Sequence, residues 1–271
     1  MPGGGGRYYA KLVSELDEPE REAVASWEHS PRVVDVKGIA RTDWSYLEFE
    51  HGRIYNVAIF RTEDSRLVHT RPEIVTKPAV VTVPMRYQEG ANPSFLSMVE
   101  ERVFAHDVVS SPHDLYGNSR PVSYSFVTVP QGHAQITHSA LASEEEEKSG
   151  FENLTHAHFR EMLEEAGYRG TGRFKHIGSF FRDQSFGASQ VSFLVAEVSP
   201  AEKARRLGRD LDSEESIGMV GWFELETLLK MCRSWRDWRA YTAVHKIREY
   251  LEGDFREPNT RFDGEFDLAT L

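Results

Sequence analysis

Segments with the pattern of β-strands precede and follow one central helical segment, and this order restricts the possible folds more than any other feature. The strand segments are 79–85, 123–130, 176–181 and 189–198. The helical segment between them is 152–168, and a second helical pattern closes the region at 238–253. Strands on both sides of a helix, with a closing helix opposite, predict an α/β fold in which a mixed sheet is sandwiched between helices.

Two further parts flank this main domain, which we place at residues 76–252. Residues 1–75 combine a helical pattern at about 8–27 with short β-rich runs, so we expect an antiparallel β appendage there. The segment 253–271 is polar, and we expect it to be a loose or partner-docked tail.

Shorter segments complete the expected order of elements. We expect a short helix at 201–207, a strand at 217–223 and a helix at 223–235. Periodicity alone does not assign residues 94–106 to a strand or to a helix.

Composition restricts the partners of the chain. A net charge of -11 argues against nucleic-acid binding. The single cysteine, Cys232, cannot form an internal disulfide, and no apolar run approaches the ~18 residues of a membrane span. The Gly-rich N-terminus lacks the apolar core of a signal peptide. We therefore expect a cytoplasmic protein that binds a small molecule and contacts no membrane.

Three carboxylates lie close together on the central helical segment. Glu161, Glu164 and Glu165 are spaced i, i+3 and i+4, so their side chains share one face of a helix and repel one another unless a cation lies between them. Hard divalent ions such as Mg²⁺ prefer oxygen ligands of this kind. The alternative interpretation is an ordinary acidic helix that faces water.

The same segment has the spacing E-x7-R-E-U-x-E-E-x-G-U, where U is an apolar residue. The matching residues are Glu152, Arg160, Glu161, Met162, Glu164, Glu165, Gly167 and Tyr168. This pattern resembles the C-terminal two-thirds of the Nudix box, the signature of hydrolases that split a nucleoside diphosphate linked to another moiety. The resemblance implies the Nudix α/β/α sandwich over the main domain, and it also implies a strand within 94–106.

The resemblance implies a metal site. It assigns Glu161 and Glu165 as principal ligands and Glu164 as a bridging or water-mediated ligand, with a backbone carbonyl near Gln131 or Gly132 completing the shell. The expected ion is Mg²⁺, with Mn²⁺ as an alternative because both ions accept carboxylate oxygen.

Three other positions of the box have structural roles by resemblance. Arg160 is expected to pair with Glu152, and Gly167 is expected to end the helix. The first glycine of the box is best matched by Gly132, which leaves 14 residues more than usual between it and Glu152.

Segments 177–198 and 215–231 resemble ADP-ribose pyrophosphatases. That likeness suggests Glu214 or Glu215 as the catalytic base. Gln184 stands where many such enzymes have a proline, which indicates an altered pocket for the group beyond the ADP moiety.

Substrate binding and assembly follow from the same resemblance. Trp44 and Phe186 are our candidates for stacking on adenine. The appendage of such enzymes commonly exchanges between the subunits of a homodimer, which we therefore expect here.

The sequence thus predicts a metal-dependent enzyme that hydrolyses the pyrophosphate of an ADP-linked dinucleotide, such as ADP-ribose, NAD or a modified NAD, and releases AMP. The alternatives are a nucleotide-sugar pyrophosphatase, a Nudix-fold module that senses a nucleotide without cleaving it, and an interaction protein in which the box is a relic.

Overall fold

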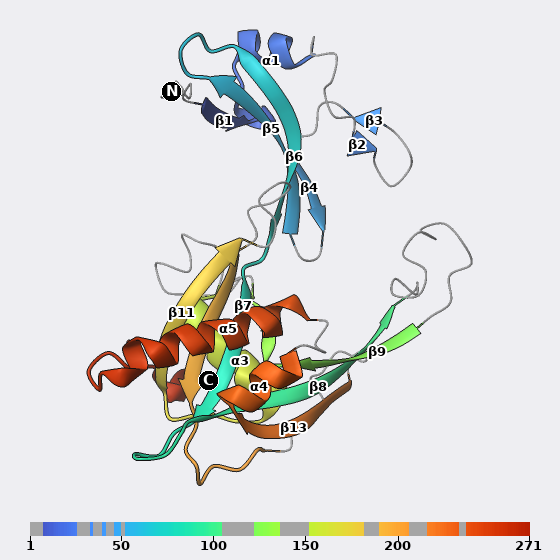
Figure 1. Cartoon of the computed structure of the whole chain (residues 1–271). Coiled ribbons are helices and arrows are strands. Elements are labelled where there is room, and N and C mark those ends of the chain that lie inside the picture. The colour runs from blue at the N-terminus through green and yellow to red at the C-terminus, as the bar shows by residue number, and fades with distance from the viewer. Residues whose placement is uncertain are drawn as a thin grey trace. The chain divides into compact units, whose positions relative to one another are not determined.

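The structure is a computed structural model. It describes residues 8–25, 33–34, 40–41, 46–49, 52–104, 122–135, 152–181, 190–205, 216–232 and 237–271. The chain divides into two compact units, each with its own sheet (Figure 1). One unit is Met1–Lys77 with Phe181–Gln190, and the other is Pro78–Phe180 with Val191–Leu271.

The first unit is built on a four-stranded antiparallel sheet, as the sequence predicted for the N-terminal appendage. Its strands are β1 (Tyr8–Leu12), β4 (Tyr46–Phe49), β5 (Gly52–Arg61) and β6 (Leu67–Thr76), and a separate pair is formed by β2 (Val33–Val34) and β3 (Ala40–Arg41). Phe60 and Leu67 are buried with Leu16 and Val24, which lie just before and within the helix α1 (Glu18–Ala25). This small cluster is the unit's own core.

The helix expected at about 8–27 begins only at Glu18, so that prediction is wrong for its first half. Residues Tyr8–Leu12 form β1, which pairs with β5, and a short 3-10 turn η1 (Val13–Glu15) follows. Tyr9 stacks on Phe60 with the ring centroids 5.4 Å apart. Pro19 fits the first turn of α1 but would break a helix that had begun at residue 8, because proline has no N–H to donate.

The second unit contains an eight-stranded mixed sheet in the order β13-β8-β7-β12-β11-β14, with β9 paired to β8 and β10 to β7. The strands are β7 (Ala79–Arg86), β8 (Ser94–Phe104), β9 (Val122–Thr128), β10 (Gln131–His133), β11 (Arg173–Phe181), β12 (Gln190–Glu197), β13 (Ser216–Glu224) and β14 (Gly264–Glu265). β12 is parallel to β7, whereas β8 and β10 are antiparallel to it. The strand that the resemblance implied within 94–106 is confirmed as β8.

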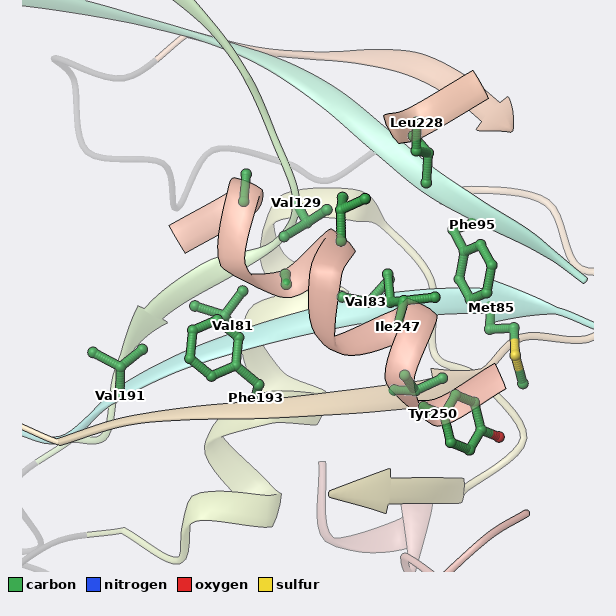
Figure 2. Close-up of a cluster of buried hydrophobic side chains, with 14 of the residues drawn as sticks. Val81, Val83, Met85, Phe95, Val129, Val191, Phe193, Leu228, Ile247 and Tyr250 are labelled. Carbon is green, nitrogen blue, oxygen red and sulfur yellow. The ribbon is translucent and has the colours of Figure 1, made fainter. Parts of the chain in front are cut away.

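Helices cover both faces of this sheet. The helices are α3 (Leu154–Ala166), α4 (Leu225–Cys232) and α5 (Trp238–Glu252). Phe159 and Met162 of α3 pack against Leu194 on one face. Ile247 of α5 packs with Val81 and Phe193 on the other, and Figure 2 shows this second layer. The α/β/α sandwich predicted from the sequence is confirmed.

The strands β7 and β8 separate within the sheet. They pair only at Met85↔Phe95 and Arg86↔Ser94. Beyond these positions β8 continues alongside β9, whereas β7 continues alongside β10 and β12 (Figure 1). Since β10 follows β9 in the chain after only Val129 and Pro130, the connection between them crosses from one branch of the sheet to the other.

The segment 253–271, expected as a polar tail, lies against the sandwich. It contains η2 (Asp254–Arg256), β14 and η3 (Leu268–Thr270), and β14 pairs with β11. Phe262 packs against the α5 layer, and Phe266 stacks on Phe159 of α3 with centroids 4.6 Å apart. Apolar residues spaced along a mostly polar segment therefore hold it in place.

Two smaller findings complete the fold. The short helix expected at 201–207 is absent from its described part, residues 201–205. Within the described ranges, no helix is both long and apolar enough to cross a membrane.

Gly167 ends α3 in a conformation that other residues adopt with strain, with φ of 73°. A Cβ there would also lie 2.3 Å from the Arg205 carbonyl oxygen. We expect Gly167→Ala to lower the free energy of unfolding by about 2–4 kcal/mol, the sum of left-handed strain and steric overlap.

Gly90→Ala is the matched control for this measurement by denaturant unfolding. Gly90 also has a positive φ, of 82°, but a Cβ there would meet nothing within 4 Å. Its substitution should cost only the backbone strain, about 1 kcal/mol. Equal losses in the two variants would show that the contact with Arg205 is unimportant.

Candidate functional site

The helix α3 presents its polar side chains to β10 because its ends and its apolar face are fixed. The Asn153 side chain caps the first turn by accepting a hydrogen bond from the Thr155 N–H at 2.8 Å, and Gly167 closes the last turn. Phe159 and Met162 bury the opposite face in the core. Two of the three glutamates that follow Arg160 in the sequence are therefore held beside the start of β10.

Arg160 is the centre of the site. Its guanidinium forms a two-pronged pair with Glu152, in which Nε donates to Oε1 and Nη2 donates to Oε2, both at 3.0 Å. Nη1 donates to Glu161 at 2.9 Å and to Glu164 at 2.7 Å, and Nη2 also donates to the His133 carbonyl at 2.9 Å. The structure thus brings Arg160 together with Glu152, as the resemblance implied, and adds two more carboxylates to the same cation.

Glu152 is buried and has several donors. Its carboxylate accepts from the Gln135 N–H at 2.9 Å and contacts His156 Nδ1 at 2.5 Å, in addition to Arg160. Burial alone would raise the pKa of this carboxyl, but the hydrogen bonds from His156, Arg160 and Gln135 outweigh burial and lower the pKa to about 2. Glu152 is therefore a fixed negative charge at neutral pH, and it joins the start of α3 to the chain just after β10.

Glu161 lies directly against the backbone of Gly132. A Cβ on Gly132 would be 2.1 Å from the Glu161 carboxyl carbon, so only glycine leaves room for this carboxylate. The residue is 9% exposed, and this burial raises the pKa of its carboxyl, with the charge of Arg160 acting in the opposite direction. A second cation beside this carboxylate would therefore stabilise its charged form.

Glu165 and Glu164 complete the acidic face. Glu165 Oε2 accepts a hydrogen bond from the backbone N–H of Gln131 at 2.7 Å. Arg160 Nη1 contacts both Glu161 and Glu164. Glu164 is the more exposed of these two residues, with 42% of its side chain accessible. Gln131 and Gly132, both predicted at the site, therefore each contact one of the predicted carboxylates.

The arrangement suits a hard cation in its chemistry, since carboxylate oxygens lie beside a glycine backbone that admits close approach. Arg160 Nη1 supplies the positive charge between Glu161 and Glu164. No three His, Cys, Asp or Glu side chains within the described ranges are arranged to hold a metal ion. An ion bound here would take over the role of Arg160 toward Glu161 or Glu164.

Gln131 also belongs to a second polar cluster that the sequence analysis did not identify. Its side chain contacts Glu100, Thr128, Asp237 and Arg239. Asp237 could have been noticed as an N-cap, because it directly precedes the helical pattern of α5. Arg239 follows on α5 itself, whereas Glu100 and Thr128 come from β8 and β9, and nothing in the local sequence indicates that these residues meet Gln131.

Five predicted residues lie outside the described ranges: Trp44, Gln184, Phe186, Glu214 and Glu215. The same is true of residues 136–151, which make up most of the connection between Gly132 and Glu152. The roles expected of the five residues in substrate binding and in base catalysis therefore stay predictions.

Comparison with known proteins gives a limited result. No protein-family model matches the chain, and no curated protein sequence matches it. Among solved structures 115 chains match. One, described as "Crystal structure of ADP compounds hydrolase", is 12% identical with a TM-score of 0.46, over 78% of this chain and 92% of that one. A likeness at this level carries no argument about activity.

Gly132→Ala should displace Glu161 and disturb its contact with Arg160, because the added methyl would overlap the carboxylate. We expect a loss of about 1–3 kcal/mol in the free energy of unfolding. Gly218→Ala is the control, since a Cβ at Gly218 of β13 would meet only the Val99 carbonyl oxygen at 4.0 Å. Similar stability of the two variants would contradict the close approach of Glu161 to Gly132.

His156 should make part of the stability depend on pH. Its hydrogen bond to Glu152 raises its pKa above the ordinary 6.5, against the opposing effect of burial. Because the folded protein holds this proton more tightly, the stabilisation is fully present below pH 6.5 and is lost as the pH rises through the raised pKa. The free energy of unfolding of wild type minus that of His156→Gln, measured across pH 5 to 9, should therefore fall as the pH rises. A difference that does not change over this range would exclude the linkage.

Proposed function

We propose that this protein is a divalent-metal-dependent hydrolase of the Nudix type, which splits the pyrophosphate bond of an ADP-linked dinucleotide. ADP-ribose, NAD and modified NAD-like compounds are the proposed substrates, and the products are AMP and a second phosphomonoester. The observation that supports this proposal is that Arg160 joins Glu152 to Glu161, and that Glu161 lies against Gly132.

The proposed metal ligands are Glu161 and Glu165, with Glu164 bridging or acting through water. When bound, Mg²⁺ or Mn²⁺ would neutralise the charge that builds on the leaving phosphate oxygen and lower the pKa of a bound water. Glu152 and Arg160 would hold the helix and its loop in place. Gly132 would leave room for the Glu161 carboxylate beside the backbone of β10.

The reaction adds one water across the anhydride. The water oxygen forms a bond to one phosphorus, the bond from that phosphorus to the bridging oxygen breaks, and the bridging oxygen leaves on the other phosphate. Glu214 or Glu215 is proposed to accept the water proton. Trp44, Phe186 and Gln184 are proposed to contact the substrate, and the N-terminal unit is proposed to join two copies as a homodimer.

One observation favours a second candidate, a Nudix-fold module that binds a nucleotide without cleaving it. Arg160 already pairs with two of the three helix carboxylates, and no preformed metal cluster is present in the described part of the chain. In such a module Arg160 would keep these pairs permanently. The hydrolase remains our proposal because Glu161, Glu164 and Glu165 are all retained, with Glu161 against Gly132 and Glu165 against Gln131.

The deciding test is incubation with NAD, NADH, ADP-ribose, diadenosine compounds, FAD, CoA and nucleotide sugars, with and without Mg²⁺ or Mn²⁺, followed by chromatography. We expect AMP to appear only with metal. Glu165→Gln should reduce the rate by roughly 100-fold or more, since it removes one charge that holds the metal. Glu252→Gln, an exposed pair with Arg248 on α5, is the control and should be as active as wild type.

Other results would redirect the assignment. Binding of one compound without turnover, in the presence of either metal, would support the sensing module. Cleavage of nucleotide sugars alone would change the substrate class but keep the reaction.

A further inference from the structure

The side-chain amide of Gln131 is held at both ends by groups at the start of α5. Its Oε1 accepts a hydrogen bond from Arg239 Nη1 at 3.2 Å, and its Nε2 donates to Asp237 Oδ2 at 3.1 Å. The residue is 7% exposed. A buried amide with partners at both ends is fixed in place.

The charges of these two partners also determine which way the amide points. If the amide turned over, its NH₂ group would face the guanidinium of Arg239 and its oxygen would face the carboxylate of Asp237, so both contacts would become repulsive. Two strand residues contribute to the same orientation. Gln131 Nε2 lies 3.2 Å from Thr128 Oγ1 and 3.4 Å from Glu100 Oε2, and both atoms can accept from it.

Asp237 uses its two oxygens for different purposes. Oδ1 caps α5 by accepting from the Arg239 N–H at 2.9 Å. Oδ2 accepts from Gln131 and from the Thr128 hydroxyl, the latter at 2.9 Å. The cap that begins α5 therefore also fixes the start of β10.

The backbone of Gln131 makes the contact with α3. Its N–H donates to Glu165 Oε2 at 2.7 Å. Gln131 is cross-strand partner to Val81, whose side chain lies in the layer beneath α5, whereas Glu165 belongs to α3 on the opposite face of the sheet. Gln131 therefore connects the start of α5 to the Glu165 carboxylate of α3.

We propose that Asp237 and Arg239 are positioning residues for Glu165, and that they act through Gln131. They hold the amide of Gln131, and this fixes the backbone N–H that orients the Glu165 carboxylate. Glu165 is a metal ligand only under the proposed function, so the effect of these residues on metal binding rests on that proposal. The contacts of Asp237 and Arg239 with Gln131 can be tested without any activity. Residues that orient metal ligands in this way commonly affect metal affinity as much as they affect folding.

The first test measures hydrogen exchange of the Gln131 backbone amide by NMR in the full-length protein. We expect Asp237→Asn and Arg239→Met to speed this exchange by about 10-fold or more, which corresponds to the loss of one well-placed hydrogen bond. Asn can still cap α5 with its oxygen, so the amides of Val244 and Ile247, which are buried in α5, should keep their wild-type rates. Unchanged exchange at Gln131 in both variants would overturn the proposal.

The second test measures the dissociation constant of Mn²⁺ by titration calorimetry. Asp237→Asn and Arg239→Met should weaken binding by about 10-fold to 100-fold, and Arg239→Lys, which retains a donor, should lie between them and wild type. Arg248→Gln is the control, because Arg248 lies on the same helix and forms an exposed pair with Glu252.

The outcomes separate this proposal from the proposed function. Mn²⁺ affinity equal to wild type in both variants would overturn the positioning role. If wild type itself bound no Mn²⁺ and hydrolysed nothing, the hydrolase assignment would fail, and the exchange rate at Gln131 would still decide whether Asp237 and Arg239 hold Glu165.

Discussion

The site depends on one guanidinium that neutralises carboxylates from two directions. Arg160 pairs with Glu152 from the loop before α3 and with Glu161 and Glu164 on the helix itself. Without this cation three acidic groups would be close together in a half-buried setting, where repulsion and desolvation would both destabilise the fold. The same cation ties α3 to β10 through the His133 carbonyl, so electrostatic balance and geometry are satisfied by one side chain.

The separation of β7 from β8 within the sheet determines where β10 lies. Because β7 and β8 pair at only two positions, β10 can pair with β7 and place Gln131 against α3 through its backbone and against the start of α5 through its side chain. Each contact with a box carboxylate uses backbone: the N–H of Gln131 for Glu165, and the bare Cα of Gly132 for Glu161.

Much of this could be predicted from the sequence where the signal is local. The strand at 79–85 and the central helix follow from periodicity, and the end of that helix at Gly167 follows from the resemblance to the Nudix box. Residues Tyr8–Leu12 were misassigned because their strand conformation depends on pairing with β5, which no local pattern reveals. Asp237 and Arg239 were missed for a related reason: they lie more than a hundred residues from Gln131, and only the fold brings them together.

All three glutamates of the acidic face lie on α3, and this determines how the site responds to acid. His158 of the same helix is fully buried between Thr82 and Ser192, and burial lowers its pKa well below the ordinary value. As the pH falls, the unfolded chain takes up a proton on His158 at a higher pH than the folded protein does. Acid therefore favours unfolding at His158 and weakens the packing of α3, whereas protonation of His156 strengthens its contact with Glu152. Since Glu161, Glu164 and Glu165 are all carried by that helix, they would leave the sheet together, and acid would disrupt this acidic face in a single cooperative event.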